Sequence, residues 1–122
     1  MTKRKLQLAT IHDWRLSMDP RKNRHEVSAY CLGAFGIVPQ YDLSRGGKRF
    51  WELYHLPSGS LVSSYPLLRE AESARAALIA LPENWQRDDL VYYDFVRQGR
   101  LSSETLQVIR TAMYGPWGES EY

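Results

Sequence analysis

The sequence predicts an α+β fold, in which a three-stranded antiparallel β-meander packs against an amphipathic helix and additional helices lie on the N- and C-terminal sides. Two patterns support this expectation. Apolar and polar residues alternate between residues 37 and 65, interrupted by turns rich in glycine, proline and serine. Apolar residues then recur at helical spacing over residues 67–81. The 122 residues, 43% hydrophobic and 25% charged, are expected to form one domain spanning residues 1–122.

The N-terminal segment, residues 1–25, is strongly basic. It carries seven basic and two acidic side chains, whereas residues 26–122 carry nine basic and twelve acidic ones. A basic segment attracts phosphates or an acidic protein surface. The same charges also serve simply to keep a chain end in solution, so both interpretations stay open.

Helical spacing occurs twice in the first third of the chain. Residues 6–18 predict an N-terminal helix from the apolar residues Leu8, Ile11, Trp14 and Met18. A short strand over residues 9–11 is the alternative. Residues 24–35 predict a second helix from Val27, Tyr30, Cys31, Ala34 and Phe35. A strand over residues 34–39 competes with it.

A core of two hairpins and a helix is expected over residues 37–81. Residues 37–43 alternate as a strand, residues 44–47 form a glycine turn, and residues 48–56 form an aromatic-rich second strand. After a turn over residues 57–60, a short third strand ends at Tyr65. The helix over residues 67–81 should cover one sheet face with Leu68, Ala71, Ala74 or Arg75, Leu78 and Leu81.

The last third predicts a helical hairpin over residues 88–114, followed by an acidic and aromatic tail over residues 115–122. Asp88 and Asp89 suit a helix start before residues 90–98. Ser102 suits the cap of a final helix that ends before Gly115. The strand propensity of residues 91–96 leaves a strand open for the first of these helices.

The sequence favours a cytoplasmic, non-enzymatic protein without a cofactor or metal. Cys31 is the single cysteine, residues 1–25 contain no apolar signal region, and no stretch is long enough to cross a membrane. His12, His25 and His55 lack metal-binding spacing. Cys31 lies on an apolar face, where a thiol is a small hydrophobe and no activated nucleophile.

Two regions have the composition of a binding surface. The hairpin over residues 45–54 combines cations with aromatic rings, which suits nucleic acid or a protein partner. The two C-terminal helices could form a DNA-binding helix-turn-helix with residues 102–114 as the recognition helix, although an ordinary helical hairpin is the simpler interpretation. The candidate binding residues are Arg45, Lys48, Arg49, Trp51, Tyr54, Arg110, Tyr114 and Trp117.

These observations favour a small protein-binding module whose partner is another protein. Small chains without catalytic motifs are often inhibitors carried by mobile genetic elements, including anti-CRISPR-like inhibitors of nucleic-acid-handling machinery. This analogy rests on size and missing motifs alone. The alternative is a DNA- or RNA-binding accessory protein that uses the basic N-terminal arm and the Arg45–Tyr54 hairpin. No membrane partner is expected.

Overall fold

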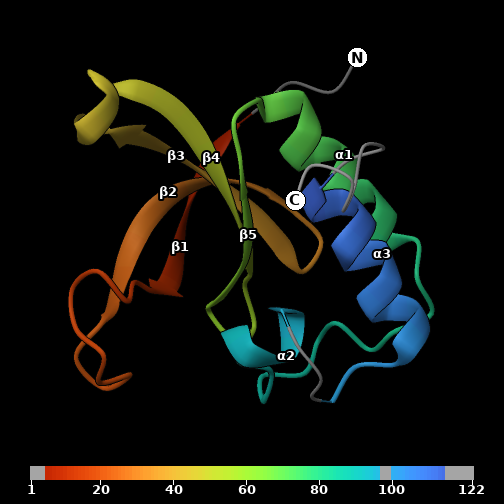
Figure 1. Ribbon diagram of the computed structural model, residues 1–122. Coiled ribbons are helices and arrows are strands. Elements are labelled where there is room, and N and C mark those ends of the chain that lie inside the picture. Colours follow the sequence, from red (N-terminus) through yellow and green to blue (C-terminus); the bar gives the residue numbers. More distant parts are fainter. Residues whose placement is uncertain (1–4, 97–99, 115–122) are drawn as a thin grey trace.

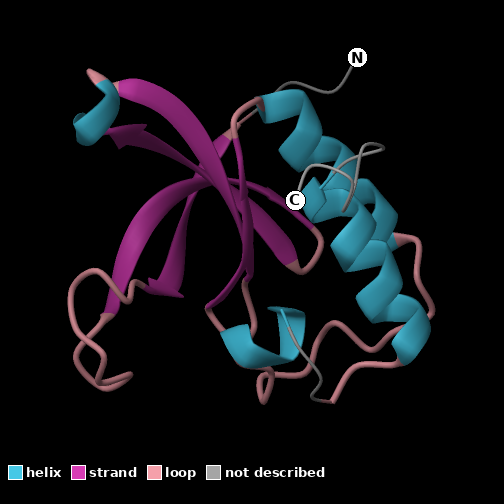
Figure 2. Cartoon of the chain, in the orientation of Figure 1, coloured by secondary structure: helices cyan, strands magenta, loops and turns pink. Residues whose placement is uncertain are grey.

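The computed structural model describes residues 5–96 and 100–114 and shows an α+β fold (Figures 1 and 2). One five-stranded antiparallel sheet has the strand order β1-β2-β3-β4-β5, a simple meander. The elements are β1 (Leu6–His12), β2 (Arg24–Leu32), β3 (Phe35–Asp42), the 3₁₀ turn η1 (Leu43–Arg45), β4 (Lys48–His55), β5 (Ser60–Tyr65), α1 (Leu68–Ile79), α2 (Tyr92–Val96) and α3 (Ser103–Tyr114). The α+β class is confirmed, and the sheet has five strands instead of three.

The predicted helices over residues 6–18 and 24–35 are wrong, because these segments form β1 and β2. Ala9 lies opposite Val27, and Ile11 lies opposite His25. The apolar residues that suggested a helix, such as Leu8 and Ile11 or Val27 and Tyr30, are three positions apart and therefore lie on opposite faces of these strands, so the helical spacing was coincidental. Pairing between segments about 20 residues apart decides the outcome, and this pairing is not visible in local spacing.

The expected helix over residues 67–81 is confirmed as α1. It crosses the sheet face formed by β3, β4 and β5, and its buried side chains are Ala71, Ala74, Arg75 and Leu78. We call this side of the sheet the helix face. Leu53 and His55 of β4 point into the same core, as the alternation along the strand predicts.

The segment expected as a helical hairpin, residues 88–114, contains two helices. α2 has five residues and contacts both β5 and α3, whereas α3 packs mainly against α1. The expected cap is confirmed, since the backbone N–H of Thr105 donates to Ser102 Oγ at 3.2 Å. Ile109 of α3 is fully buried in the core on the helix face.

The opposite side of the sheet, the inner face, curls around a second apolar cluster. This inner cluster contains Ile11, Ala29, Val38 and Tyr54. Ile11 on β1 and Tyr54 on β4 belong to this one cluster although two strands separate them in the sheet, so the sheet must be strongly coiled. The His12 backbone N–H donates to the Gly59 carbonyl at 2.8 Å, which joins the end of β1 to the turn before β5.

The sheet splits between β2 and β3. Among the described residues, these strands pair only from Tyr30–Ile37 to Leu32–Phe35. Beyond that point the β1–β2 arm and the β3–β4 arm diverge (Figure 1). Leu56 N–H donates to the Ala34 carbonyl at 2.8 Å, which makes these residues a hydrogen-bonded pair.

Proline explains where the split begins. Hydrogen bonding alternates along an antiparallel strand, so the even residues of β3 bond to β4 and the odd ones turn toward β2. Continuing the β2–β3 register would place Pro39 opposite Ser28. Pro39 has no N–H to donate there, and the ladder stops.

Replacing Gly59 tests the closure between β1 and the β4–β5 turn. Gly59 has φ +72°, and an added Cβ would lie 2.9 Å from His12 Cδ2 and 3.4 Å from His12 N. We expect Gly59→Ala to lower the free energy of unfolding by about 2–3 kcal/mol in urea titrations, through left-handed strain and overlap together.

Gly46→Ala is the matched control. Gly46 has φ +68°, but nothing lies within 4 Å of an added Cβ. We expect this variant to lose about 1 kcal/mol, from the left-handed conformation alone. Equal losses in the two variants would contradict the closure.

Candidate functional site

The β3–β4 hairpin projects from the body of the protein and ends in an ordered tip (Figure 1). Asp42 organises this tip, because its Oδ1 accepts hydrogen bonds from the Ser44 N–H at 3.1 Å and the Ser44 hydroxyl at 2.6 Å. The Gly47 N–H donates to the Asp42 carbonyl at 2.9 Å. Leu43, at the tip, is 86% exposed. The hairpin therefore presents an apolar side chain on a fixed turn.

A cation lies between two aromatic rings on the helix face of this hairpin. The guanidinium carbon of Arg49 is 4.9 Å from the centre of the Tyr41 ring and 5.9 Å from that of Trp51. An Arg49 Nη2–H also donates to the Tyr41 hydroxyl. Tyr41 and Arg49 are directly opposite on β3 and β4. These contacts hold the arginine in one orientation while the ring of Tyr41 stays exposed.

The other predicted cations of the hairpin are exposed at its end. Arg45 Nε lies 3.6 Å from Asp42 Oδ2, an ion pair between exposed side chains. Lys48 is exposed and lies opposite Asp42, so it belongs to the inner face, away from Arg49. The structure thus brings Arg45, Lys48 and Arg49 to one hairpin but on different faces.

The remaining predicted residues do not join this surface. Tyr54 is 2% exposed, lies in the inner cluster and donates its hydroxyl to Glu52. Arg110 is exposed on α3, on the far side of the molecule from the hairpin (Figure 1). The side chain of Tyr114 and the whole of Trp117 lie outside the described residues.

A polar network that joins the outer end of the β1–β2 arm to the β3–β4 arm was missed by the sequence analysis. Arg15, which follows β1, donates from Nη2 to Glu52 Oε1 at 2.8 Å and from Nε to Asp13 Oδ1 at 2.8 Å. The Gln40 amide also donates to Glu52 Oε1 at 3.0 Å. Both carboxylates are buried, whereas half of the Arg15 side chain is exposed. Arg15 and Glu52 are 37 residues apart, and no local pattern signals their contact.

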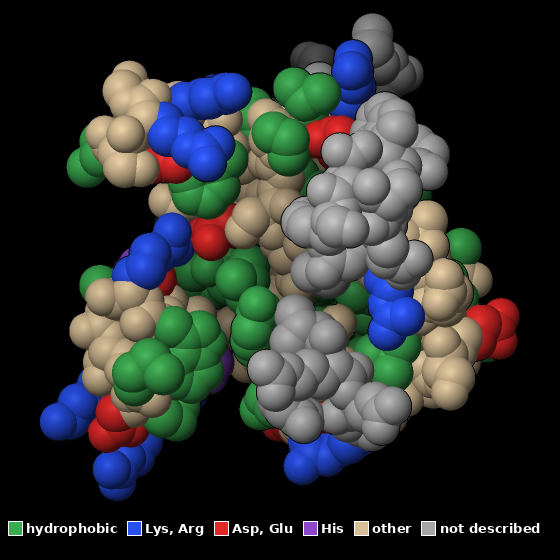
Figure 3. Space-filling view, in the orientation of Figure 1, with side chains coloured by type: hydrophobic (Ala, Val, Ile, Leu, Met, Phe, Trp, Pro, Cys, Tyr) green, Lys and Arg blue, Asp and Glu red, His purple; other side chains and the backbone are tan. Residues whose placement is uncertain are grey.

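Arg15 also sets the ionisation of Asp13. Burial acts to raise the pKa of Asp13, but hydrogen bonds from the Arg15 side chain and backbone outweigh it, so the pKa lies below its ordinary value of 3.8. His25 Nε2 lies 3.5 Å from Asp13 Oδ2. The arginine therefore compensates two buried acids at once. Figure 3 shows a hollow between the two arms, with Lys and Arg side chains on both.

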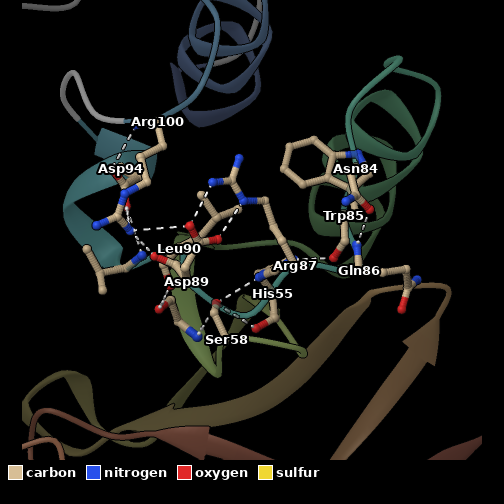
Figure 4. Close-up of polar contacts among 12 residues, drawn as sticks. His55, Ser58, Asn84, Trp85, Gln86, Arg87, Asp89, Leu90, Asp94 and Arg100 are labelled. Atoms are coloured by element: carbon tan, nitrogen blue, oxygen red, sulfur yellow. Dashed lines mark hydrogen bonds and ion pairs between the residues drawn. The ribbon is translucent and has the colours of Figure 1, made fainter.

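A second polar cluster ties the chain after α1 to the sheet (Figure 4). His55 is fully buried, and burial lowers its pKa, which favours the neutral ring. Its Nε2 is 2.6 Å from the Trp85 carbonyl, so Nε2 carries the proton, and its Nδ1 accepts from the Ser58 hydroxyl at 2.7 Å. Ser60 donates to the Leu90 carbonyl at 2.9 Å. The polar groups of His55 and Ser60 thus have hydrogen-bond partners and are buried, which indicates a structural role.

Within residues 5–96 and 100–114, no group of three or more His, Cys, Asp or Glu side chains is arranged to hold a metal ion. Burial raises the pKa of the Cys31 thiol, with a smaller opposing effect of Arg75. None of the described helices is long and apolar enough to span a membrane. No family model, curated protein or solved structure matches this chain.

The Asp13–Arg15 pair makes the free energy of unfolding depend on pH in the acidic range. A carboxyl group whose pKa is lowered by folding stabilises the fold above its unfolded pKa, and this contribution disappears as pH falls through the folded value. We therefore expect the unfolding free energy of the native protein to fall as the pH drops below about 4, and Asp13→Asn to flatten this fall.

Urea titrations at several pH values would measure this effect. Arg15→Gln should flatten the same part of the curve, because hydrogen bonds from Arg15 are what lower the pKa of Asp13. Parallel curves for the native protein and both variants would show that Asp13 does not contribute.

Proposed function

We propose that this chain is a small non-enzymatic protein-binding module that contacts its partner with the tip of the β3–β4 hairpin. The observation that supports this most directly is the orientation of Arg49 between the rings of Tyr41 and Trp51. Arginine, tyrosine and tryptophan contribute most of the binding energy at many protein interfaces. Side chains that are already ordered lose less conformational entropy on binding.

The chemistry of the tip indicates the kind of partner. Arg45, Lys48 and Arg49 belong to the same hairpin end as the exposed Leu43, and Asp42 is the acid among them. An apolar contact ringed by cations fits a protein surface that has an apolar depression with acidic residues around it. The acidic side chains would speed association and orient the hairpin.

The narrower idea of an anti-CRISPR-like inhibitor from a mobile genetic element remains a hypothesis within this proposal. It rests on the size of the chain and its lack of catalytic motifs. Residues 115–122, the acidic and aromatic tail that was expected to contribute, lie outside the described residues.

Nucleic acid is the second candidate partner, because the hairpin also combines cations with an exposed aromatic ring. The Tyr41 ring could stack on a base while Arg45 and Lys48 contact phosphates. An exposed leucine at the end of the tip contributes nothing to phosphate binding, and for this reason we favour a protein.

Affinity capture with matched variants tests the protein-binding proposal. The native chain, after nuclease treatment, should retain one protein from cells that encode it. Arg49→Glu and Leu43→Ser should each weaken this retention by about tenfold or more, as is typical of central interface residues. Quantitative mass spectrometry is the measurement.

Arg69→Glu is the control, since Arg69 is exposed on α1 and the charge change is the same. Equal retention by the native chain and the hairpin variants would refute the proposal. Loss of retention in Arg69→Glu alone would place the interface on the helices.

Gel-shift titrations test the nucleic-acid alternative. If it holds, duplex DNA should bind at about 50 mM salt and dissociate steeply as salt rises. Changing Arg45, Lys48 and Arg49 together to alanine should abolish the shift, whereas Leu43→Ser should leave it unchanged. A shift lost only in Arg110→Ala would identify α3 as the reading helix. Absence of any shift removes this alternative.

A further inference from the structure

Two open strand edges face each other where β2 and β3 diverge. Asp13 N–H donates to the Asn23 carbonyl at 2.8 Å, which continues the β1–β2 ladder and shows which residues of β2 are hydrogen-bonded to β1. The odd residues of β2 therefore bond to β1, and the even residues Arg24, Glu26 and Ser28 turn their backbone groups toward β3. On β3, Pro39 and Tyr41 turn theirs toward β2.

These backbone groups have no strand partner within the described parts of the chain, where the β2–β3 pairing ends at Tyr30–Ile37. Three residues of β2 offer both an N–H and a carbonyl at the spacing of an extended strand. A row of alternating donors and acceptors matches another extended backbone. It does not match a phosphate chain, which offers acceptors without amide donors.

The side chains around these edges define two different environments. Arg24 and Glu26 are exposed on the helix face of β2, and Arg49 lies on the helix face of the other arm. On the inner face, Val27 packs against the inner cluster. A strand between the arms would alternate its side chains in the same way, with acidic residues toward the arginines and apolar residues toward Val27.

We propose that the space between β2 and β3 binds an extended, acidic polypeptide segment, which adds to the Arg24–Ser28 edge of β2 as a further strand. This inference deepens the proposed protein-binding function and rests on it. The hollow between the arms and the cations on both of them agree with such an occupant (Figure 3). Arg15 pairs with the buried Asp13 and Glu52, which reduces their repulsion of such a segment.

A synthetic peptide of about eight residues that alternates glutamate and valine is the probe. Labelled at one end, it should bind the native protein in fluorescence anisotropy titrations, and the amides of Arg24, Glu26 and Ser28 should become protected from hydrogen exchange. A matched peptide that alternates lysine and valine should bind at least about tenfold more weakly, because its charges are reversed.

Ser28→Pro removes the donor of the edge that is nearest the split without touching the β1 ladder, since the Ser28 N–H points away from β1. We expect it to weaken peptide binding about tenfold, by loss of the hydrogen bond and by the bulk of the ring. Ser28→Ala keeps the N–H and should bind as the native protein does. Thermal unfolding would establish that both variants are folded.

Pro39→Val is a second and independent test, which does not depend on the folding of Ser28→Pro. The new N–H can donate to the Ser28 carbonyl, so β2 and β3 should pair one step further and close the space. The backbone amide that this substitution introduces should be protected from exchange in the free variant, and peptide binding should be lost.

Three results would overturn the inference. The first is absence of saturable peptide binding up to about 1 mM. The second is equal binding of the peptide by Ser28→Pro and Ser28→Ala. The third is displacement of the peptide by duplex DNA together with no effect of Ser28→Pro, and this result would indicate a nucleic-acid surface. Peptide binding that fails while Arg49→Glu still weakens partner capture would leave the hairpin interface standing and reject strand addition alone.

Discussion

The absent backbone N–H of Pro39 is the constraint on which the shape of this protein depends. The ladder between β2 and β3 stops at the position where that donor is needed, and the coiled sheet opens into two arms. The β3–β4 hairpin is then free to extend beyond α1, so its outer half has no helix covering it. The ordered Arg49, the exposed Leu43 and the two open edges are all consequences of this one break.

The Arg15 network joins the outer end of the β1–β2 arm to Glu52 on β4 and so keeps the two arms in a fixed relation. Burying the carboxylates of Asp13 and Glu52 is costly unless each is paired and hydrogen-bonded. A single guanidinium group satisfies both, and the Gln40 amide adds a third bond. Removing Arg15 would leave two buried negative charges close together. The contact is therefore structural.

The parts of the fold that follow from local patterns could be predicted from the sequence. The strands from residue 37 to residue 65 alternate regularly between glycine-containing turns, and α1 has an apolar stripe along its length. β1 and β2 could not be distinguished from helices. Leu8 and Ile11, like Val27 and Tyr30, have helical spacing, and only pairing across the intervening loop selects the strand.

The candidate site shows the same division. The cations of the hairpin were found because they are adjacent in the sequence, whereas the role of Arg15 depends on a residue 37 positions away. Tyr54 was assigned to a surface because a flat sheet covered by one helix leaves its other face in solvent. The sheet instead curls, and Tyr54 meets Ile11 from β1 in a second core. The curvature of the sheet, which no local pattern encodes, decides whether that ring is buried.

An open strand edge is ordinarily a liability, because it can pair with another copy of the same chain. Here the side chains around the edges discourage that outcome. Arg15 and Arg24 on one arm and Lys48 and Arg49 on the other would meet their own counterparts in a self-paired complex, and like charges at close range oppose it. Pro39 further limits pairing on β3, since it presents a carbonyl without a donor. The same cations attract an acidic strand, so the charge pattern that opposes self-association also selects the partner.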